Sequence, residues 1–234
     1  MLPPQDLAAI VLTIKLAAVT TVILLLLGTP LAWWLANTRL RAKPLLEAIV
    51  ALPLVLPPTV LGFYLLLAFA PDSLLGQLWI GITGQPLAFS FNALVIGSVL
   101  YSLPFVVQPL QTSFEQLPKT LLEAAATMGA DAKDQFISIV MPLTQRSFIT
   151  AASLGFAHTV GEFGVVLMIG GNIPGETQVL SIALYDKVEN LQYNEAHWLA
   201  GGLVIFSLLL LALIYSFNRP SIVRKTFKAK GSAV

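Results

Sequence analysis

The stretch PKTLLEAAATMGADAKDQFISIVMP, from Pro118 to Pro142, lies between two long apolar segments. Pro118 suits the first turn of a helix, where its missing N–H removes no hydrogen bond, and the next ten residues are mostly good helix formers. Gly129 can adopt the left-handed conformation that ends a helix, and Asp131 can cap a second helix that begins near Ala132. The stretch therefore predicts a short helix, a glycine break and a second helix that runs toward the neighbouring apolar segment.

The first of these helices should be amphipathic. Four apolar residues fall on one helical face, namely Leu121, Leu122, Ala125 and Met128. The small residues Ala124, Ala125 and Ala126 would let the backbone of a partner approach closely. The polar residues Lys119, Glu123 and Asp131 border the helix.

Composition places the chain in a membrane. Of its 234 residues 56% are hydrophobic and 11% are charged, whereas soluble domains carry about 25% charged residues. The chain has no Cys, which excludes disulfides and cysteine-based zinc or redox chemistry. A net charge of +1 gives no general footprint for nucleic acid.

The hydropathy pattern predicts an all-α integral membrane protein, with residues 1–234 forming one transmembrane domain. A helical span needs about 20 predominantly apolar residues, and the stretches that qualify are residues 7–36, 45–70, 89–112, 147–171 and 198–217. The first is too long for a signal peptide and lacks a basic start, so we expect it to be retained. Residues 74–82 are too few to span and predict an interfacial helix, and residues 179–188 predict a short helix or a re-entrant piece.

The basic residues set the expected orientation. Eleven of the thirteen Lys and Arg residues fall between spans one and two, between spans three and four, or after span five: Arg39, Arg41, Lys43, Lys119, Lys133, Arg146, Arg219, Arg224, Lys225, Lys228 and Lys230. Basic residues favour the cytoplasmic side. We therefore expect the N-terminus outside, the C-terminus in the cytoplasm, and the loop of residues 118–142 in the cytoplasm. Lys15, near the outer end of span one, should extend its ammonium group to the interface.

Span two contains prolines that a regular helix cannot accommodate. Pro53, Pro57 and Pro58 each remove a backbone hydrogen bond and clash one turn back. Carbonyl groups freed at membrane depth need protein or water around them. The segment therefore either lines a pathway, where the Thr59 hydroxyl could contribute, or carries a kink that only shapes helix packing.

Span four carries the polar sequence His158-Thr159-Val160-Gly161-Glu162-Phe163-Gly164. A carboxylate at membrane depth costs about 2.5–3.5 kcal/mol on insertion scales, and such groups usually face a bundle interior or a wet cavity. His158 and Glu162 are four residues apart, which predicts that they share a helical face and can pair. Two roles stay open for them: a structural pair that fixes packing, or involvement near a gate.

Enzymatic motifs are not found. The sequence has no Gly-x-x-x-x-Gly-Lys-Ser/Thr phosphate loop, and it shows no catalytic Ser-His-Asp, His-Glu-x-x-His or paired-carboxylate arrangement. We expect no enzyme activity, no cofactor and no metal in this chain.

The spacing of the 118–142 loop resembles the cytoplasmic "EAA" loop of bacterial ABC-importer permeases. That pattern matches Glu123, Ala124, Ala125, Gly129, Ile139 and Pro142, with Met141 where Leu is usual. In that family the short helix, here ending near Met128, docks into a groove on the ATP-hydrolysing subunit and transmits its motion. The alternative is an amphipathic helix that lies on the membrane surface.

Two further stretches resemble molybdate permeases in particular: Pro53 to Gly62, and Gly161 to Gly164 followed by Gly171 to Gln178. The resemblance implies a type I ABC importer permease in the inner membrane. It also implies a second copy of this chain, two copies of a cytoplasmic ATPase that uses ATP, and an extracytoplasmic oxyanion-binding protein. His158 stands where Arg is expected in many relatives. Pro57, Pro58, Thr59, His158 and Glu162 are the pathway or gate candidates. Tungstate or sulfate import, and a secondary transporter or channel that uses Glu162, are the alternatives.

Overall fold

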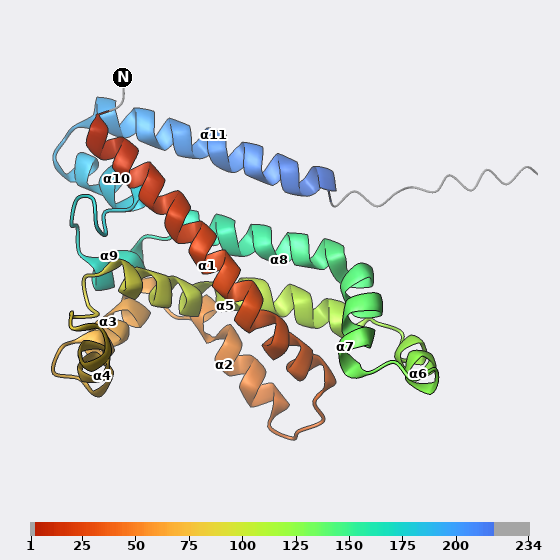
Figure 1. Ribbon diagram of the computed structural model, residues 1–234. Coiled ribbons are helices and arrows are strands. Elements are labelled where there is room, and N and C mark those ends of the chain that lie inside the picture. The colour runs from red at the N-terminus through yellow and green to blue at the C-terminus, as the bar shows by residue number, and fades with distance from the viewer. Residues whose placement is uncertain (1–2, 218–234) are drawn as a thin grey trace, which may run out of the picture.

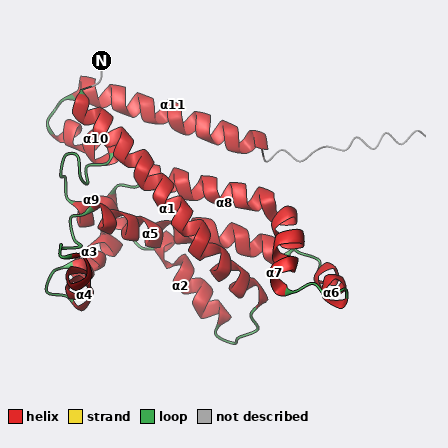
Figure 2. Ribbon diagram, viewed as in Figure 1, coloured by secondary structure: helices red, strands yellow, loops and turns green. Residues whose placement is uncertain are grey.

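The computed structural model describes residues 3–217, and within this range all regular structure is helical (Figures 1 and 2). The elements are α1 (Pro4–Asn37), α2 (Lys43–Val55), α3 (Pro58–Phe69), α4 (Leu74–Thr83), α5 (Phe91–Glu115), α6 (Lys119–Thr127), α7 (Ala132–Gln135), the π-helical turn η1 (Phe136–Val140), α8 (Met141–Gly161), α9 (Gly164–Gly170), α10 (Leu180–Glu189) and α11 (Tyr193–Phe217). The basic residues expected after span five, from Arg219 onward, lie outside the described residues.

The centre of the bundle is made by α1, α5 and α8, which pack against one another along their lengths. Helices α1, α5 and α11 are each long and apolar enough to cross a membrane, and they overlap the predicted spans 7–36, 89–112 and 198–217. Helix α11 contacts mainly α10 and α8 and lies along one side of the bundle (Figure 1). Helices α4 and α10 are short, as expected for residues 74–82 and 179–188.

The spans predicted as 45–70 and 147–171 are each divided into two helices. Helices α2 and α3 meet at an angle of 107°, and the helix that ends at Gly161 meets α9 at 60°. The prolines account for the first break, as predicted. The second break was not predicted: Glu162 leaves the helix with extended backbone angles (φ −68°, ψ 134°).

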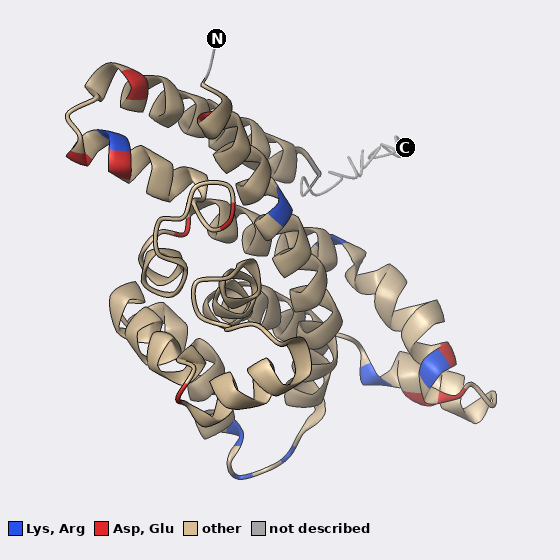
Figure 3. Cartoon of the chain, turned by 60° about the vertical axis from the view of Figure 1, so that its left-hand side comes forward, with Lys and Arg blue, Asp and Glu red and all other residues tan. Residues whose placement is uncertain are grey.

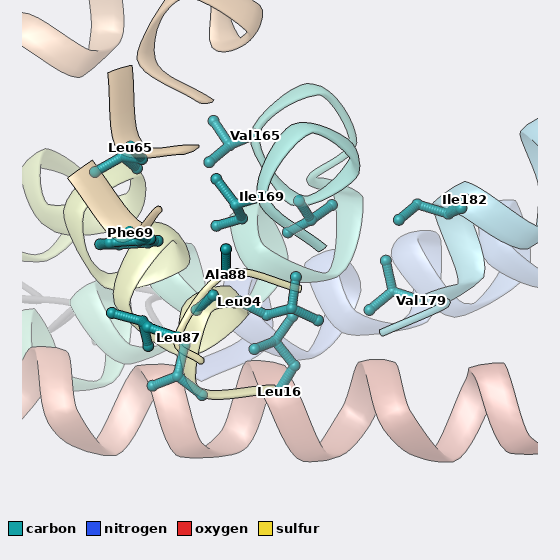
Figure 4. Close-up of a cluster of buried hydrophobic side chains, with 13 residues drawn as sticks. Leu16, Leu65, Phe69, Leu87, Ala88, Leu94, Val165, Ile169, Val179 and Ile182 are labelled. Carbon is teal, nitrogen blue, oxygen red and sulfur yellow. The ribbon is translucent and has the colours of Figure 1, made fainter. Parts of the chain in front are cut away.

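Apolar side chains form two buried clusters. One surrounds Leu16, Leu94 and Ile169 and lies near α9 and α10 (Figure 4). The other surrounds Leu24 and Val106 and lies toward the α6 end of the bundle. Because lipid is as apolar as these side chains, close packing rather than exclusion of water holds such helices together.

Buried hydroxyl groups lie between the two clusters along the central helices. Thr20 on α1, Ser98 and Ser102 on α5, and Thr159 on α8 are all buried. Along the chain, each of these hydroxyl side chains lies between residues of one apolar cluster and residues of the other. Polar side chains at such positions usually bond between helices or serve a site.

An ion-paired group ties α10 to its neighbours at the end of the bundle opposite α6. The Lys187 ammonium lies 3.2 Å from a carboxylate oxygen of Asp6 on α1 and 2.5 Å from one of Glu195 on α11. Burial lowers the pKa of Lys187, but the hydrogen bonds to Glu195 and Asp6 outweigh it, so the pKa lies above its ordinary value. Figure 3 shows charged residues mostly at the ends of helices and in connecting segments.

Candidate functional site

The loop of residues 118–142 has the local structure that the sequence predicts. Helix α6 begins directly after Pro118 and ends before Gly129, which adopts a left-handed conformation with φ +89°. The Asp131 carboxylate accepts a hydrogen bond of 2.7 Å from the N–H of Asp134 and so caps α7. The helix–glycine–helix prediction is confirmed.

The predicted apolar face of α6 is divided between the core and the surface. Leu122 packs against the cluster around Leu24 and Val106, and Ala125 is buried. Leu121 is 45% exposed and Met128 is 83% exposed, so the four apolar residues do not all pack against this chain. The helix is rotated so that Leu121 and Met128 stand free, together with the exposed Glu123 and Ala124.

Aromatic side chains attach this loop to the bundle. Phe136 in η1 lies 5.9 Å from Trp33 of α1 and 6.5 Å from Phe114 of α5 between ring centroids. The motif residue Ile139 is partly buried in η1, and Pro142 lies in the first turn of α8. The segment from α7 through η1 to α8 therefore joins the loop to a central helix without a break.

The pathway candidates surround a second region, a cavity of about 540 Å³. It lies where the start of α3, the middle of α5, the end of α8 and the start of α9 meet. Its polar lining comes from Thr59, Tyr101, His158 and Glu162. The rest of the lining is Pro58, Ala157, Gly161, Phe163, Gly164, Leu167 and Met168.

The structure thus brings four of the five pathway candidates together. Pro58, Thr59, His158 and Glu162 all line the cavity. Pro57 does not line it; it is exposed and precedes the first residue of α3. The two helix breaks touch here, because a Cβ added to Gly164 would lie 2.7 Å from Cβ of Pro58.

His158 and Glu162 do not pair, contrary to the sequence-based prediction. The break at Glu162 ends the helix before the i,i+4 relation is completed. Instead the Nδ1 atom of His158 lies 2.8 Å from the Ser102 hydroxyl of α5. The imidazole stacks on Phe105 at 4.0 Å between centroids and lies 4.8 Å from the Tyr101 ring.

Glu162 is held by its backbone rather than by its carboxyl group. The Ser181 hydroxyl of α10 donates a 2.6 Å hydrogen bond to the Glu162 carbonyl. The side chain is 3% exposed, and within the described residues neither carboxyl oxygen has a hydrogen-bond partner. The Ser98 hydroxyl lies nearby but makes no hydrogen bond of acceptable geometry. A buried polar group without a partner is costly, so its presence in a native structure calls for an explanation such as a functional role.

Sequence reasoning missed Tyr101, Ser102 and Ser181. Tyr101 reaches the cavity and Ser102 reaches His158 from α5, and Ser181 reaches the α8–α9 break from α10. Both helices are distant in sequence from His158 or from the α2–α3 segment that the sequence singled out. No local pattern marks them, although Gly161 and Gly164 on either side of Glu162 are a signal for a break. No group of three His, Cys, Asp or Glu side chains that could hold a metal occurs in residues 3–217.

Comparison with known sequences gives a consistent assignment. Residues 28–222 match the family model described as "Binding-protein-dependent transport system inner membrane component". The chain is 57% identical over 218 residues to the molybdenum transport system permease protein ModB of Azotobacter vinelandii, covering 93% of this chain and 96% of that protein. It is 34% identical over 184 residues to ModB of Escherichia coli K12, covering 77% and 79%. It is 31% identical over 208 residues to the sulfate permease CysT of the same organism, covering 89% and 75%.

Solved structures share the fold at low sequence identity. A bacterial alginate ABC transporter in complex with its pentasaccharide-bound periplasmic protein aligns with a TM-score of 0.76 and 14% identity, covering 93% of this chain and 79% of that one. The methionine transporter MetNI aligns with a TM-score of 0.64 and 16% identity, covering 90% and 95%. The chain therefore belongs to the inner membrane components of binding-protein-dependent transport systems, as a multi-pass permease with the fold of type I ABC importers.

Proposed function

We propose that this chain is the membrane-spanning subunit of an ATP-driven importer that moves molybdate across the inner membrane. The observation that carries the proposal is the 57% identity to a molybdenum permease along nearly the whole chain. The sulfate permeases share only 31–32%, which favours molybdate over sulfate. Tungstate is a tetrahedral dianion like molybdate, so it is an expected second substrate.

ATP hydrolysis is assigned to a separate cytoplasmic subunit, present in two copies. The sequence has no phosphate loop of its own, and α6 offers an exposed edge for docking that includes Glu123, Ala124 and Met128. Ala125 and Gly129 shape this helix and its end, and Ile139 and Pro142 continue it into α8. Motion of α6 would therefore reach the cavity through α8.

The remaining partners are a second copy of this chain, an extracytoplasmic oxyanion-binding protein and membrane lipid. Helices α6 and α10 lie at opposite ends of the bundle (Figure 1), so docking surfaces for the ATPase and the binding protein are well separated. The distribution of Lys and Arg supports an outer N-terminus and a cytoplasmic C-terminus. We assign the cavity to the translocation pathway, with Pro58 in its wall, Pro57 outside it at the adjoining helix break, and Thr59, His158 and Glu162 at its gate.

ATP hydrolysis by the reconstituted complex tests this proposal. The chain is co-reconstituted with its ATPase subunit and binding protein, and each of molybdate, tungstate and sulfate is added in turn. We expect loaded binding protein to stimulate hydrolysis, most strongly with molybdate. An assembled complex that no oxyanion stimulates would remove the substrate assignment, and strongest stimulation by sulfate would replace it.

A further inference from the structure

The cavity at the helix breaks has an unusual charge pattern for an oxyanion pathway. Its titratable lining residues are Tyr101 from α5, His158 from α8 and Glu162 from the α8–α9 break. Helices α3 and α9 contribute none, and the lining of this cavity includes no Lys or Arg. His158 is therefore the one lining side chain that can become positively charged where a dianion has to pass.

A chain of hydroxyl groups leads from Gly155 to His158. The Thr159 hydroxyl donates its proton to the Gly155 carbonyl at 2.9 Å. Either hydroxyl could donate the 3.2 Å contact between Thr159 and Ser102, and because the Thr159 proton lies on Gly155 we assign Ser102 as its donor. With the Ser102 proton used, the 2.8 Å contact between Ser102 and His158 is donated by Nδ1–H of the imidazole.

This arrangement determines what the other ring nitrogen offers to the cavity. When Nδ1 carries the proton of a neutral imidazole, Nε2 carries a lone pair and can only accept a hydrogen bond. Within the described residues Nε2 has no hydrogen-bond partner, and the stacked Phe105 and the neighbouring Tyr101 hold the ring in place. A neutral His158 would therefore turn a lone pair toward an incoming anion.

We propose that His158 is a proton-linked contact for the tetrahedral oxyanion: its ring takes up a proton at Nε2 as the anion enters and donates this N–H to an anion oxygen. This inference rests on the proposed function. The Thr59 and Tyr101 hydroxyls, which have no partners among the described residues, are available as neutral donors on the same cavity. Ser102 is a positioning residue, because it keeps Nδ1 as the donor.

The proton comes from water and returns to water when the anion leaves, so no covalent step is involved. A proton taken from Glu162 would leave a carboxylate facing the anion, which Coulomb repulsion disfavours. The consequence is that passage of the anion is linked to proton concentration. Uptake should fall by up to tenfold for each pH unit above the value at which His158 in the empty cavity loses its proton.

The experiment measures molybdate uptake by the complete transporter in proteoliposomes, from about pH 6 to about pH 9 with equal pH on both sides. All variants share the same ATPase and binding protein, so dividing the uptake of a variant by that of wild type at each pH cancels the pH dependence of those partners. We expect His158→Arg, with a fixed charge, and His158→Gln, with an amide donor that does not titrate, to lose the dependence of uptake on pH that His158 confers. Their uptake relative to wild type should therefore rise with pH. Ser102→Ala should weaken the dependence of uptake on pH although His158 is intact, because the neutral ring can then carry its proton on Nε2 and donate it. Glu162→Gln should keep this dependence.

The outcomes separate the inference from the function on which it rests. Molybdate uptake that is independent of pH in wild type, or a wild-type slope retained by His158→Gln, overturns the role of His158 and leaves the importer standing. A wild-type slope lost in Glu162→Gln would move the titrating group to Glu162. No molybdate uptake at any pH by a complex whose ATPase is active overturns both.

Discussion

The two helix breaks that meet at the cavity are built in different ways. Between α2 and α3 the chain bends by 107° at Leu56 and Pro57, where Pro57 and Pro58 have no N–H to satisfy. Between α8 and α9 it bends by 60° at Glu162 and Phe163, and no proline is present. The first break follows from covalent structure alone, whereas the second depends on neighbouring side chains.

The contacts at the second break come mainly from α10 and α3. Ser181 bonds the Glu162 carbonyl, the Tyr185 ring lies 5.0 Å from the Phe163 ring, and Gly164 packs on Pro58. A break held by such contacts can be adjusted by movement of its neighbours. We therefore expect α2–α3 to form the fixed wall of the cavity and α8–α9 to be the part able to change.

The largest effect is expected where α10 itself is anchored. Lys187→Met leaves the buried Asp6 carboxylate without a cation and should lower the free energy of unfolding by about 3–5 kcal/mol, measured by thermal unfolding of the purified protein. Because the Lys187 pKa is raised, the ion pairs stabilise fully below its ordinary pKa and are lost as pH rises through the raised value. The loss of stability in Lys187→Met should therefore persist through neutral pH. Glu195→Gln changes an exposed partner and should lower the free energy of unfolding by about 1 kcal/mol or less. Equal losses in the two variants would contradict the conclusion that the buried Asp6–Lys187 pair is the main anchor of α10.

The next effect concerns the contact between the two breaks. In Gly164→Ala the new Cβ would lie 2.7 Å from Pro58, so the breaks have to separate, at about 1–3 kcal/mol. Substrate-stimulated ATP hydrolysis should fall with stability. Gly161→Ala is the matched control, because nothing lies within 4 Å of its added Cβ. If both variants behave alike, close packing of α9 on α3 is not what sets the second break.

A smaller effect is expected from the hydrogen bond that supports the second break. Ser181→Ala removes the donor to the Glu162 carbonyl and should cost about 1 kcal/mol. Ser181→Thr keeps a hydroxyl and should restore both stability and stimulation by the binding protein, read as thermal midpoint and hydrolysis rate. An alanine variant with wild-type stimulation would show that α10 does not control the break.

The smallest effect is expected at the first break. Pro57→Ala restores an N–H at an exposed position, but Pro58 still disfavours helical conformation in the residue before it. Unfolding free energy should change by no more than about 0.5 kcal/mol, and molybdate uptake should stay near wild type. A loss comparable to that of Gly164→Ala would remove the contrast between the breaks.

Local sequence chemistry predicted much of this architecture. The prolines at 53, 57 and 58 predicted a broken span, and Gly129 and Asp131 predicted the turn and cap after α6. These features could be predicted because a proline or a left-handed glycine acts on its own backbone, whatever surrounds it.

The organisation of the cavity could not be predicted in the same way. The expected His158–Glu162 pair assumed an unbroken helix, whereas the break depends on contacts such as that of Ser181 in α10. The partner of His158 is Ser102, which lies 56 residues away. Helical periodicity also grouped Leu121 and Met128 with Ala125, but it could not show which side of α6 faces this chain.

The length of α8 has a mechanical consequence. Its 21 residues, Met141–Gly161, span about 32 Å at about 1.5 Å per residue. A helix of this length is a lever: a tilt of about 5° at its Met141 end would displace Gly161 by roughly 3 Å. Rotation too slight to disturb the packing at one membrane face can thus change the width of the opening at the other.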